Sequence, residues 1–159
     1  MYCIVLIVGK QAPEFSVLNQ HNKQLRLVDF KGKWLVLYFY PKDFTPGCTT
    51  EGCDFTKFYS EFKALNCEIV GVSPDTIESH KKFAAEHKIE FNLLADSEAK
   101  ACKAYSVWAQ KNIAGKFFLG VNRTTFIIGP DGIVKEVFHK VQSAGHVQEV
   151  LNKLKYLQM

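Results

Sequence analysis

Two uninterrupted apolar runs dominate the pattern of hydrophobic and polar positions along the chain. Residues 34–40 read Trp-Leu-Val-Leu-Tyr-Phe-Tyr and are closed by Pro41, and residues 68–73 read Glu-Ile-Val-Gly-Val-Ser. Short runs without alternation are typical of strands that are buried on both faces of a sheet. A third apolar stretch, 124–128, is followed by the turn sequence Gly-Pro-Asp-Gly and by residues 133–140, which predicts a β-hairpin.

Four further segments show the apolar spacing of amphipathic helices. They span residues 50–65, 76–87, 97–105 and 143–157. Asp96 or Ser97 is the expected N-cap of the third helix, because either side chain can accept a hydrogen bond from a free N–H group. The order of elements predicts an α/β protein with a central mixed sheet and helices on both of its faces. Strands joined by a helix are expected to run parallel, and the hairpin adds antiparallel pairing.

Length and charge narrow the class of protein. The chain has 159 residues, 47% of them apolar and 23% charged, which suits one domain over residues 1–159 with a sizeable core. The net charge of +4 comes from scattered Lys and Arg side chains, so neither nucleic acid nor a membrane is an expected partner. The apolar run 3–8 is too short for a signal-peptide core or a membrane span. Residues 1–7 are therefore expected to form a short extension or an added edge strand, and the expected location is cytoplasmic.

Five cysteines, an odd number with irregular spacing, make a poor disulfide framework. In a reducing compartment, close cysteines more often serve redox chemistry or metal binding. A zinc site needs about four ligands, whereas Cys48 and Cys53 supply two and the five histidines are dispersed. No metal is therefore expected. Cys67 and Cys102 adjoin the predicted core and, like Cys3, are expected to be chemically inert.

The segment with the most informative chemistry runs from the end of the first buried strand into the first helix. The strand ends at Tyr40, a polar loop follows, and a helix is expected to begin at about Gly47 or Cys48. Ligand sites of open α/β sheets favour this position beyond the carboxyl end of a core strand. The free N–H groups and partial positive charge of a helix start also stabilise a thiolate relative to a thiol. Cys48 is therefore predicted to be a reactive thiol.

Two residues that precede Cys48 are expected to shape its pocket. Thr45 lies three residues earlier and can donate its hydroxyl proton to the sulfur or to a bound oxygen. Pro41 has no N–H group, so it can shield the pocket without competing for the sulfur. Both are candidate site residues for this reason.

A second cysteine, Cys53, lies five residues after Cys48 on the same predicted helix. Residues at that spacing are roughly 8–9 Å apart at Cα in an intact helix, whereas a disulfide needs about 4.4–6.8 Å. A disulfide between these two cysteines would therefore require local unwinding of the helix. Gly52 is a poor helix former inside that segment, so it lowers the cost of unwinding.

These residues form a recognisable motif. The pattern Pro41-x-x-x-Thr45-x-x-Cys48 resembles the active-site motif of the peroxiredoxins, and the Cys-x4-Cys spacing resembles the bacterioferritin comigratory protein (PrxQ) subfamily. The resemblance covers nearly the whole chain, with further matches at residues 8–15, at Asp96, at residues 105–108 and at residues 122–132.

The resemblance implies a thioredoxin-like fold and a role for each matching residue. It implies that Cys48 is the peroxidatic cysteine, that Cys53 is the resolving cysteine, and that Pro41 and Thr45 shape and polarise the pocket. It further implies that Arg123 lies beside the thiolate. A permanent cation there would stabilise the thiolate and orient the peroxide oxygens.

The resemblance also implies a reaction cycle. Cys48 would reduce hydrogen peroxide or an organic hydroperoxide and become a sulfenic acid, and Cys53 would then form a disulfide with it. A thioredoxin-type partner would reduce that disulfide, with no metal and no organic cofactor, in a monomeric protein. Some relatives carry a resolving cysteine near the position of Cys102, which is therefore an alternative to Cys53. His87 and His139 are not expected to act as bases, because the helix start and the arginine already account for the Cys48 thiolate.

Two other functions fit parts of the sequence. A dithiol–disulfide oxidoreductase would carry Cys-x-x-Cys at a helix start, whereas this chain has Cys-x4-Cys. A non-catalytic redox sensor or metal-binding module would react slowly with peroxide. It would not need the combination of Pro41, Thr45, Cys48 and Arg123, which favours the peroxidase.

Overall fold

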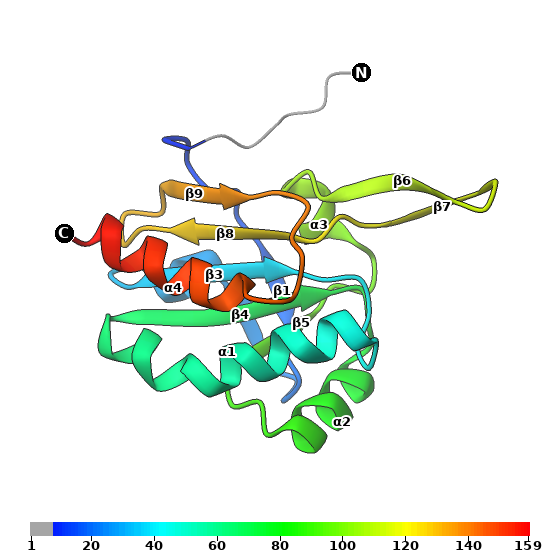
Figure 1. Cartoon of the computed structure of the whole chain (residues 1–159), viewed down its shortest axis with the longest axis horizontal. Coiled ribbons are helices and arrows are strands. Elements are labelled where there is room, and N and C mark those ends of the chain that lie inside the picture. The colour runs from blue at the N-terminus through cyan, green and yellow to red at the C-terminus, as the bar shows by residue number, and fades with distance from the viewer. Residues whose placement is uncertain (1–7) are drawn as a thin grey trace.

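The computed structural model describes residues 8–159, and its centre is a mixed five-stranded sheet (Figure 1). The strand order is β5-β4-β3-β8-β9. The five strands are β3 (Trp34–Phe39), β4 (Cys67–Ser73), β5 (Asn92–Ala95), β8 (Thr124–Ile128) and β9 (Val134–Phe138). Strands β3, β4 and β5 run parallel, while β8 and β9 are antiparallel to their neighbours. The predicted central strands, their parallel pairing and the terminal hairpin are confirmed.

Helices cover both faces of this sheet, as predicted, but they do so unequally (Figure 1). Helices α1 (Pro46–Ala64), α2 (Ile77–His87) and α4 (His146–Leu157) pack on one face. The other face carries only the 3-10 helix η1 (Leu27–Phe30) and the short α3 (Lys100–Ala104). None of the helices in residues 8–159 combines the length and apolarity that a membrane crossing needs.

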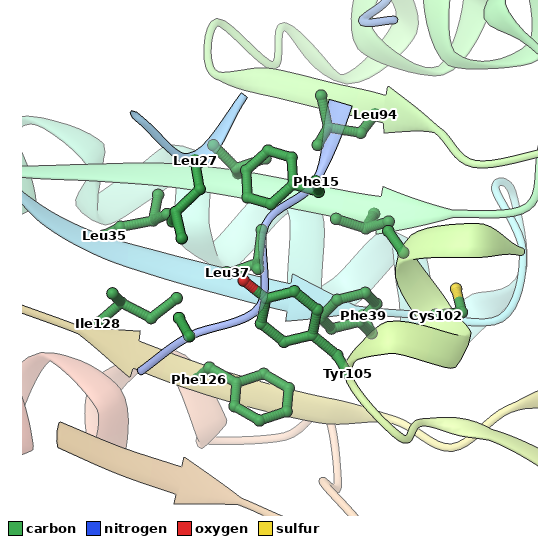
Figure 2. Packing of buried hydrophobic residues seen from close by; sticks show 14 of the residues in the cluster. Phe15, Leu27, Leu35, Leu37, Phe39, Leu94, Cys102, Tyr105, Phe126 and Ile128 are labelled. Carbon is green, nitrogen blue, oxygen red and sulfur yellow. The ribbon is translucent and has the colours of Figure 1, made fainter. Parts of the chain in front are cut away.

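Strand β3 contributes side chains to both halves of the core. Leu35, Leu37 and Phe39 point toward the face of η1 and α3, where Figure 2 shows them packed with aromatic and aliphatic neighbours. Val36 and Tyr38 point to the opposite face, under the three longer helices. Successive strand residues alternate between faces, so a strand that is buried on both sides reads as an uninterrupted apolar run.

The third predicted helix is shorter than the spacing indicated. Residues 97–105 were expected, whereas α3 spans Lys100–Ala104. Ala99 takes a left-handed conformation with φ of 57°, which delays the helix start. The Asp96 carboxylate accepts hydrogen bonds from the backbone N–H groups of Ala101 and Cys102, at 3.1 and 2.8 Å. Asp96 therefore supplies acceptors to the first turn from outside the helix, as its expected capping role required.

A second hairpin, absent from the predicted elements, projects from the body of the molecule (Figure 1). It consists of β6 (Trp108–Ile113) and β7 (Lys116–Val121), joined by a two-residue turn in which Ala114 and Gly115 both have positive φ. Two short strands, β1 (Ser16–Leu18) and β2 (Gln24–Arg26), also pair with each other. The expected extension or edge strand over residues 1–7 lies outside the described residues.

Candidate active site around Cys48

The start of α1 holds Cys48 at the carboxyl end of β3. Thr45 is the N-cap residue in an extended conformation, Pro46 opens the helix, and Cys48 is its third residue. Proline suits a first helical position, because its fixed φ is helical and its missing N–H needs no partner there. The Cys48 side chain is buried, with 1% of its surface exposed. The thiol therefore lies in the first turn of a helix, as predicted, and is shielded from bulk water.

Arg123 reaches this sulfur from the start of β8. Its Nη2 donates a hydrogen bond to Cys48 Sγ at 3.2 Å. Strand β8 runs antiparallel to β3, and Thr124 pairs with Phe39, so the start of β8 lies beside the end of β3. A permanent cation in direct contact with the sulfur stabilises the thiolate. The structure thus brings Arg123 and Cys48 together across 75 positions of sequence.

Gly47 leaves the space in which the guanidinium lies. A Cβ at this position would come within 3.0 Å of Arg123 Nη2 and 2.9 Å of Ser143 Oγ. Both distances are shorter than ordinary carbon contacts, so a larger residue would displace the arginine. Here glycine is required by the close approach of another side chain rather than by an unusual backbone angle.

Glu51 is a functional candidate that the sequence did not reveal. It lies three residues after Cys48, and its Oε1 accepts a hydrogen bond from Arg123 Nη1 at 3.1 Å. The Glu51 side chain is fully buried, and its Oε2 has no hydrogen-bond partner among the described residues. Burial raises the pKa of this carboxyl to about 7, although Arg123 acts to lower it. The available signal was the i, i+3 spacing from Cys48, which places both side chains on one helix face.

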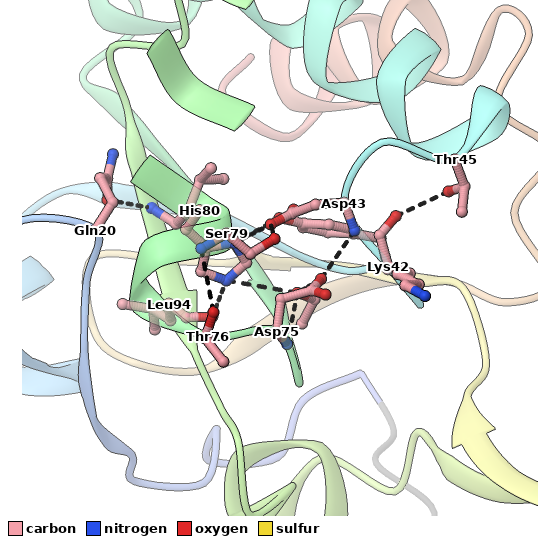
Figure 3. Close-up of polar contacts among 12 residues, drawn as sticks. Gln20, Lys42, Asp43, Thr45, Asp75, Thr76, Ser79, His80 and Leu94 are labelled. Carbon is pink, nitrogen blue, oxygen red and sulfur yellow. Dashed lines mark hydrogen bonds and ion pairs between the residues drawn. The ribbon is translucent and has the colours of Figure 1, made fainter. Parts of the chain in front are cut away.

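Thr45 and Pro41 lie at the pocket, but Thr45 makes a different hydrogen bond from the one expected. The Thr45 hydroxyl donates to the Lys42 carbonyl oxygen at 2.8 Å (Figure 3). A hydroxyl has one proton to donate, so the predicted donation to the Cys48 sulfur is absent in this conformation. Pro41 is half-buried in the loop that follows β3, where its ring interrupts backbone pairing.

A buried polar network fixes the loop between β3 and α1 (Figure 3). The Asp43 carboxylate lies 2.7 Å from His80 Nδ1 and accepts hydrogen bonds from Tyr40 and Ser79. His80 Nε2 lies 2.9 Å from the Leu94 carbonyl oxygen, so this nitrogen must carry a proton to donate. The Asp43 N–H donates to Asp75 at 2.8 Å. The loop that precedes Cys48 is therefore tied to β4, α2 and β5.

The same network contains the one group of metal-binding residue types within residues 8–159. Asp43, Asp75 and His80 bring their ligand atoms within 4.8 Å of one another. Their facing atoms are already paired, since Asp43 contacts His80 directly and Asp75 accepts from Ser73 Oγ at 2.6 Å. This arrangement satisfies buried polar groups with hydrogen bonds, and neither site cysteine belongs to it.

The remaining cysteines differ sharply in their surroundings. Cys53 is half-buried on α1, and burial and the nearby Asp54 raise the pKa of its thiol. Helix α1 is continuous from Pro46 to Ala64 and all four described cysteines are free thiols. Burial raises the pKa of Cys67 and Cys102 far above the usual range for a thiol. Cys102 also lies in the core on the opposite face of the sheet from Cys48, which favours Cys53 as its partner.

A buried thiol at a helix start, in contact with a guanidinium, is the arrangement of a thiol-based peroxidase on a thioredoxin-like α/β fold. The chain belongs to the AhpC/TSA family, whose family model matches residues 8–137.

Three relatives place the chain more closely. It is 45% identical over 148 residues to Peroxiredoxin Bcp of Bacillus subtilis (strain 168), which covers 93% of this chain and 94% of the relative. The structure of the Xanthomonas campestris bacterioferritin comigratory protein superposes with a TM-score of 0.90 at 39% identity, covering 98% and 99% of the two chains. Peroxiredoxin Q of the same organism superposes with a TM-score of 0.88 at 41% identity, covering 96% of each chain. The predicted subfamily and thioredoxin-like fold are thereby confirmed.

Proposed function

We propose that the protein reduces hydrogen peroxide and organic hydroperoxides at Cys48. The observation that carries this proposal is the 3.2 Å contact between Arg123 Nη2 and the buried Cys48 Sγ in the first turn of α1. A thiolate is the nucleophilic form of cysteine, and both the helix start and the guanidinium favour it. The X. campestris relative is described by its alkyl peroxide reduction activity, which supports organic hydroperoxides as substrates here.

In the first step the Cys48 thiolate attacks the terminal oxygen of the peroxide. A sulfur–oxygen bond forms, the O–O bond breaks, and the departing alkoxide or hydroxide takes up a proton to leave as alcohol or water. Arg123 is positioned to hold the oxygens, because a guanidinium presents several fixed donors. Its second contact, with Glu51, sets the direction of those donors.

In the second step Cys53 attacks the Cys48 sulfenic acid. A Cys48–Cys53 disulfide forms and water leaves. The first two turns of α1 must unwind for this step, because the intact helix holds the two cysteines too far apart. A dithiol of the thioredoxin type then reduces the disulfide by thiol–disulfide exchange. The protein needs no cofactor in this cycle. We expect it to act as a monomer, since the contacts that build the site come from one chain.

The test is a single-turnover reaction of the reduced protein with hydrogen peroxide and with an organic hydroperoxide. Wild type is compared with Cys48→Ser and Cys53→Ser, with Cys102→Ser as a matched control, and the disulfides are mapped by mass spectrometry. We expect Cys48→Ser to be inert, Cys53→Ser to stop at the sulfenic acid, and Cys102→Ser to behave as wild type.

Two results would contradict parts of the proposal. Wild type that reacts no faster than a free thiol would exclude the peroxidase and favour a redox sensor. A disulfide between Cys48 and Cys102 in the Cys53→Ser variant would leave the nucleophile correct and show that the resolving cysteine is wrong.

A further inference from the structure

Cys53 has a specific partner that the peroxide step does not use. Its Sγ lies 3.7 Å from His87 Nδ1, a sulfur hydrogen-bond distance between α1 and the last turn of α2. The two residues are 34 positions apart, so only the fold brings them together. The sequence alone gave no reason to assign His87 a role, because the Cys48 thiolate needs no base. The contact with Cys53 is a different one.

The His87 ring is held in place by aromatic neighbours. Its centroid lies 5.1 Å from that of Phe83 and 6.5 Å from that of Phe44, in the loop before α1. Helices α1 and α2 approach closely here, since a Cβ at Gly52 would lie 3.3 Å from Ile89 Cδ1. The imidazole is therefore positioned against the Cys53 sulfur by packing from three segments.

Cys53 needs help to become a nucleophile. The thiolate and not the thiol attacks a sulfenic acid, yet burial and Asp54 both raise the pKa of this thiol. The helix start and the guanidinium that favour the thiolate act on Cys48. Cys53 lies two turns further along α1, beyond the reach of a helix-end charge effect.

We propose that His87 is the general base that takes the proton of Cys53 when it attacks the Cys48 sulfenic acid. This inference rests on the proposed peroxidase function. In the tautomer protonated at Nε2, Nδ1 accepts the Cys53 proton while the Sγ–Sγ bond forms and the S–O bond of the sulfenic acid breaks. The leaving hydroxide takes up a proton from solvent, and the imidazolium later returns its own proton to solvent. The net products are one disulfide and one water, with no further oxidant or reductant.

The contact can persist through the unwinding that disulfide formation requires. Only the turns between Cys48 and Cys53 have to open, so Cys53 can stay against α2 while Cys48 moves toward it. The imidazolium formed would lie in the last turn of α2, where the free carbonyl groups of a helix end interact favourably with a cation.

The experiment separates the two chemical steps. Reduced protein is mixed with hydrogen peroxide, and the reaction is quenched with an alkylating reagent at successive times. Mass spectrometry then gives the rate of Cys48 oxidation and the rate of Cys48–Cys53 disulfide formation. The variants are His87→Ala and His87→Gln, with His139→Gln as a control at an exposed histidine outside this contact. Each variant is measured with and without added imidazole.

Both His87 variants should oxidise Cys48 at the wild-type rate and form the disulfide about 100-fold more slowly, as for loss of a general base. Imidazole should restore part of the rate in His87→Ala and leave wild type unchanged, which a purely structural role would not produce. Disulfide formation at the wild-type rate in His87→Gln would overturn the inference and leave the peroxidase intact. Wild type without Cys48 oxidation or without a Cys48–Cys53 disulfide would instead overturn the proposed function itself, and this inference with it.

Discussion

At the scale of single residues, Arg123 divides its guanidinium between two acceptors. Nη2 contacts Cys48 Sγ and Nη1 contacts the Glu51 carboxylate, at 3.2 and 3.1 Å. Its backbone is fixed as well, since its carbonyl oxygen accepts a hydrogen bond from Val141 N at 3.0 Å. The planar fork of arginine allows both contacts at once, which the single ammonium of lysine cannot reproduce.

Substitution of Arg123 should therefore slow the peroxide step in a graded way. We expect Arg123→Met to slow Cys48 oxidation by about 100-fold, the usual effect of removing one donor at a developing charge. Arg123→Lys should fall between the two, because it keeps the charge without the fork. Stopped-flow measurements give the rates, with Arg26→Met, at the other arginine of the chain, as control. Equal rates for Arg123→Met and wild type would exclude a role for this contact.

Glu51 should give the folded protein a distinct pH dependence. Folding raises the pKa of this carboxyl from 4.5 to about 7, mainly through burial. The folded state therefore binds this proton more tightly than the unfolded state. The resulting stabilisation is fully present below about pH 4.5 and is lost as the pH rises through about 7.

The Glu51→Gln variant tests this dependence. Its stability relative to wild type should rise by roughly 3 kcal/mol between pH 4.5 and pH 8, from about 1.4 kcal/mol per unit of pKa change. Urea unfolding at a series of pH values measures the difference, and titrations common to both proteins cancel. Parallel stability curves for the two proteins would show that Glu51 titrates normally.

At the scale of elements, the loop between β3 and α1 is rigid because α2 holds it. The buried pair of Asp43 and His80, at 2.7 Å, is the centre of that attachment. Removing one partner of a buried ion pair leaves the other uncompensated, which costs about 3–5 kcal/mol. We expect Asp43→Ala and His80→Ala each to destabilise the protein in this range. The double variant should lose less than their sum, by about 0.5–3 kcal/mol, in urea unfolding. Additive losses would mean that the two side chains act independently.

The unwinding of α1 has a measurable signature. When the Cys48–Cys53 disulfide forms, we expect backbone amides of residues 46–53 to exchange with deuterium faster than in the reduced protein. Residues 54–64 should keep their protection, because Phe55 and Phe62 anchor that part of α1 in the core. Hydrogen exchange with mass spectrometry compares the two forms. Unchanged protection at the start of α1 would contradict the unwinding.

The elements that the sequence predicted share one property, a burial pattern that leaves a clear periodicity. Strands β3 and β4 are covered on both faces, and α4 carries a one-sided apolar stripe. Strand β5 was missed because its four residues are too few for a pattern. The β6–β7 hairpin was missed because it lies outside the core, with exposed Phe117 and Leu119 and a two-residue Ala-Gly turn. Its polar and apolar order therefore reflects no buried face.

At the scale of the whole molecule, the site depends on the mixed direction of the central sheet. Thr124 pairs with Phe39 because β8 runs antiparallel to β3, and this places Arg123 beside the helix start that carries Cys48. The local motif of Cys48, Thr45 and Pro41 could be predicted because it is contiguous. Arg123 could be assigned only through the family resemblance, and the contacts of Glu51 are visible only in three dimensions.

Because the site joins residues 75 positions apart, its reactivity should disappear with the global fold. We expect the rate of Cys48 oxidation by peroxide, measured on its own peptide by mass spectrometry, to fall to that of a free thiol along a urea series. The fall should occur no later than the loss of helical circular dichroism, since small domains unfold cooperatively. A rate that outlasts the global transition would mean that residues 40–54 alone create the reactive thiol. In that case Arg123 would orient the peroxide rather than activate the sulfur, and the Arg123→Met variant would retain a normal thiolate.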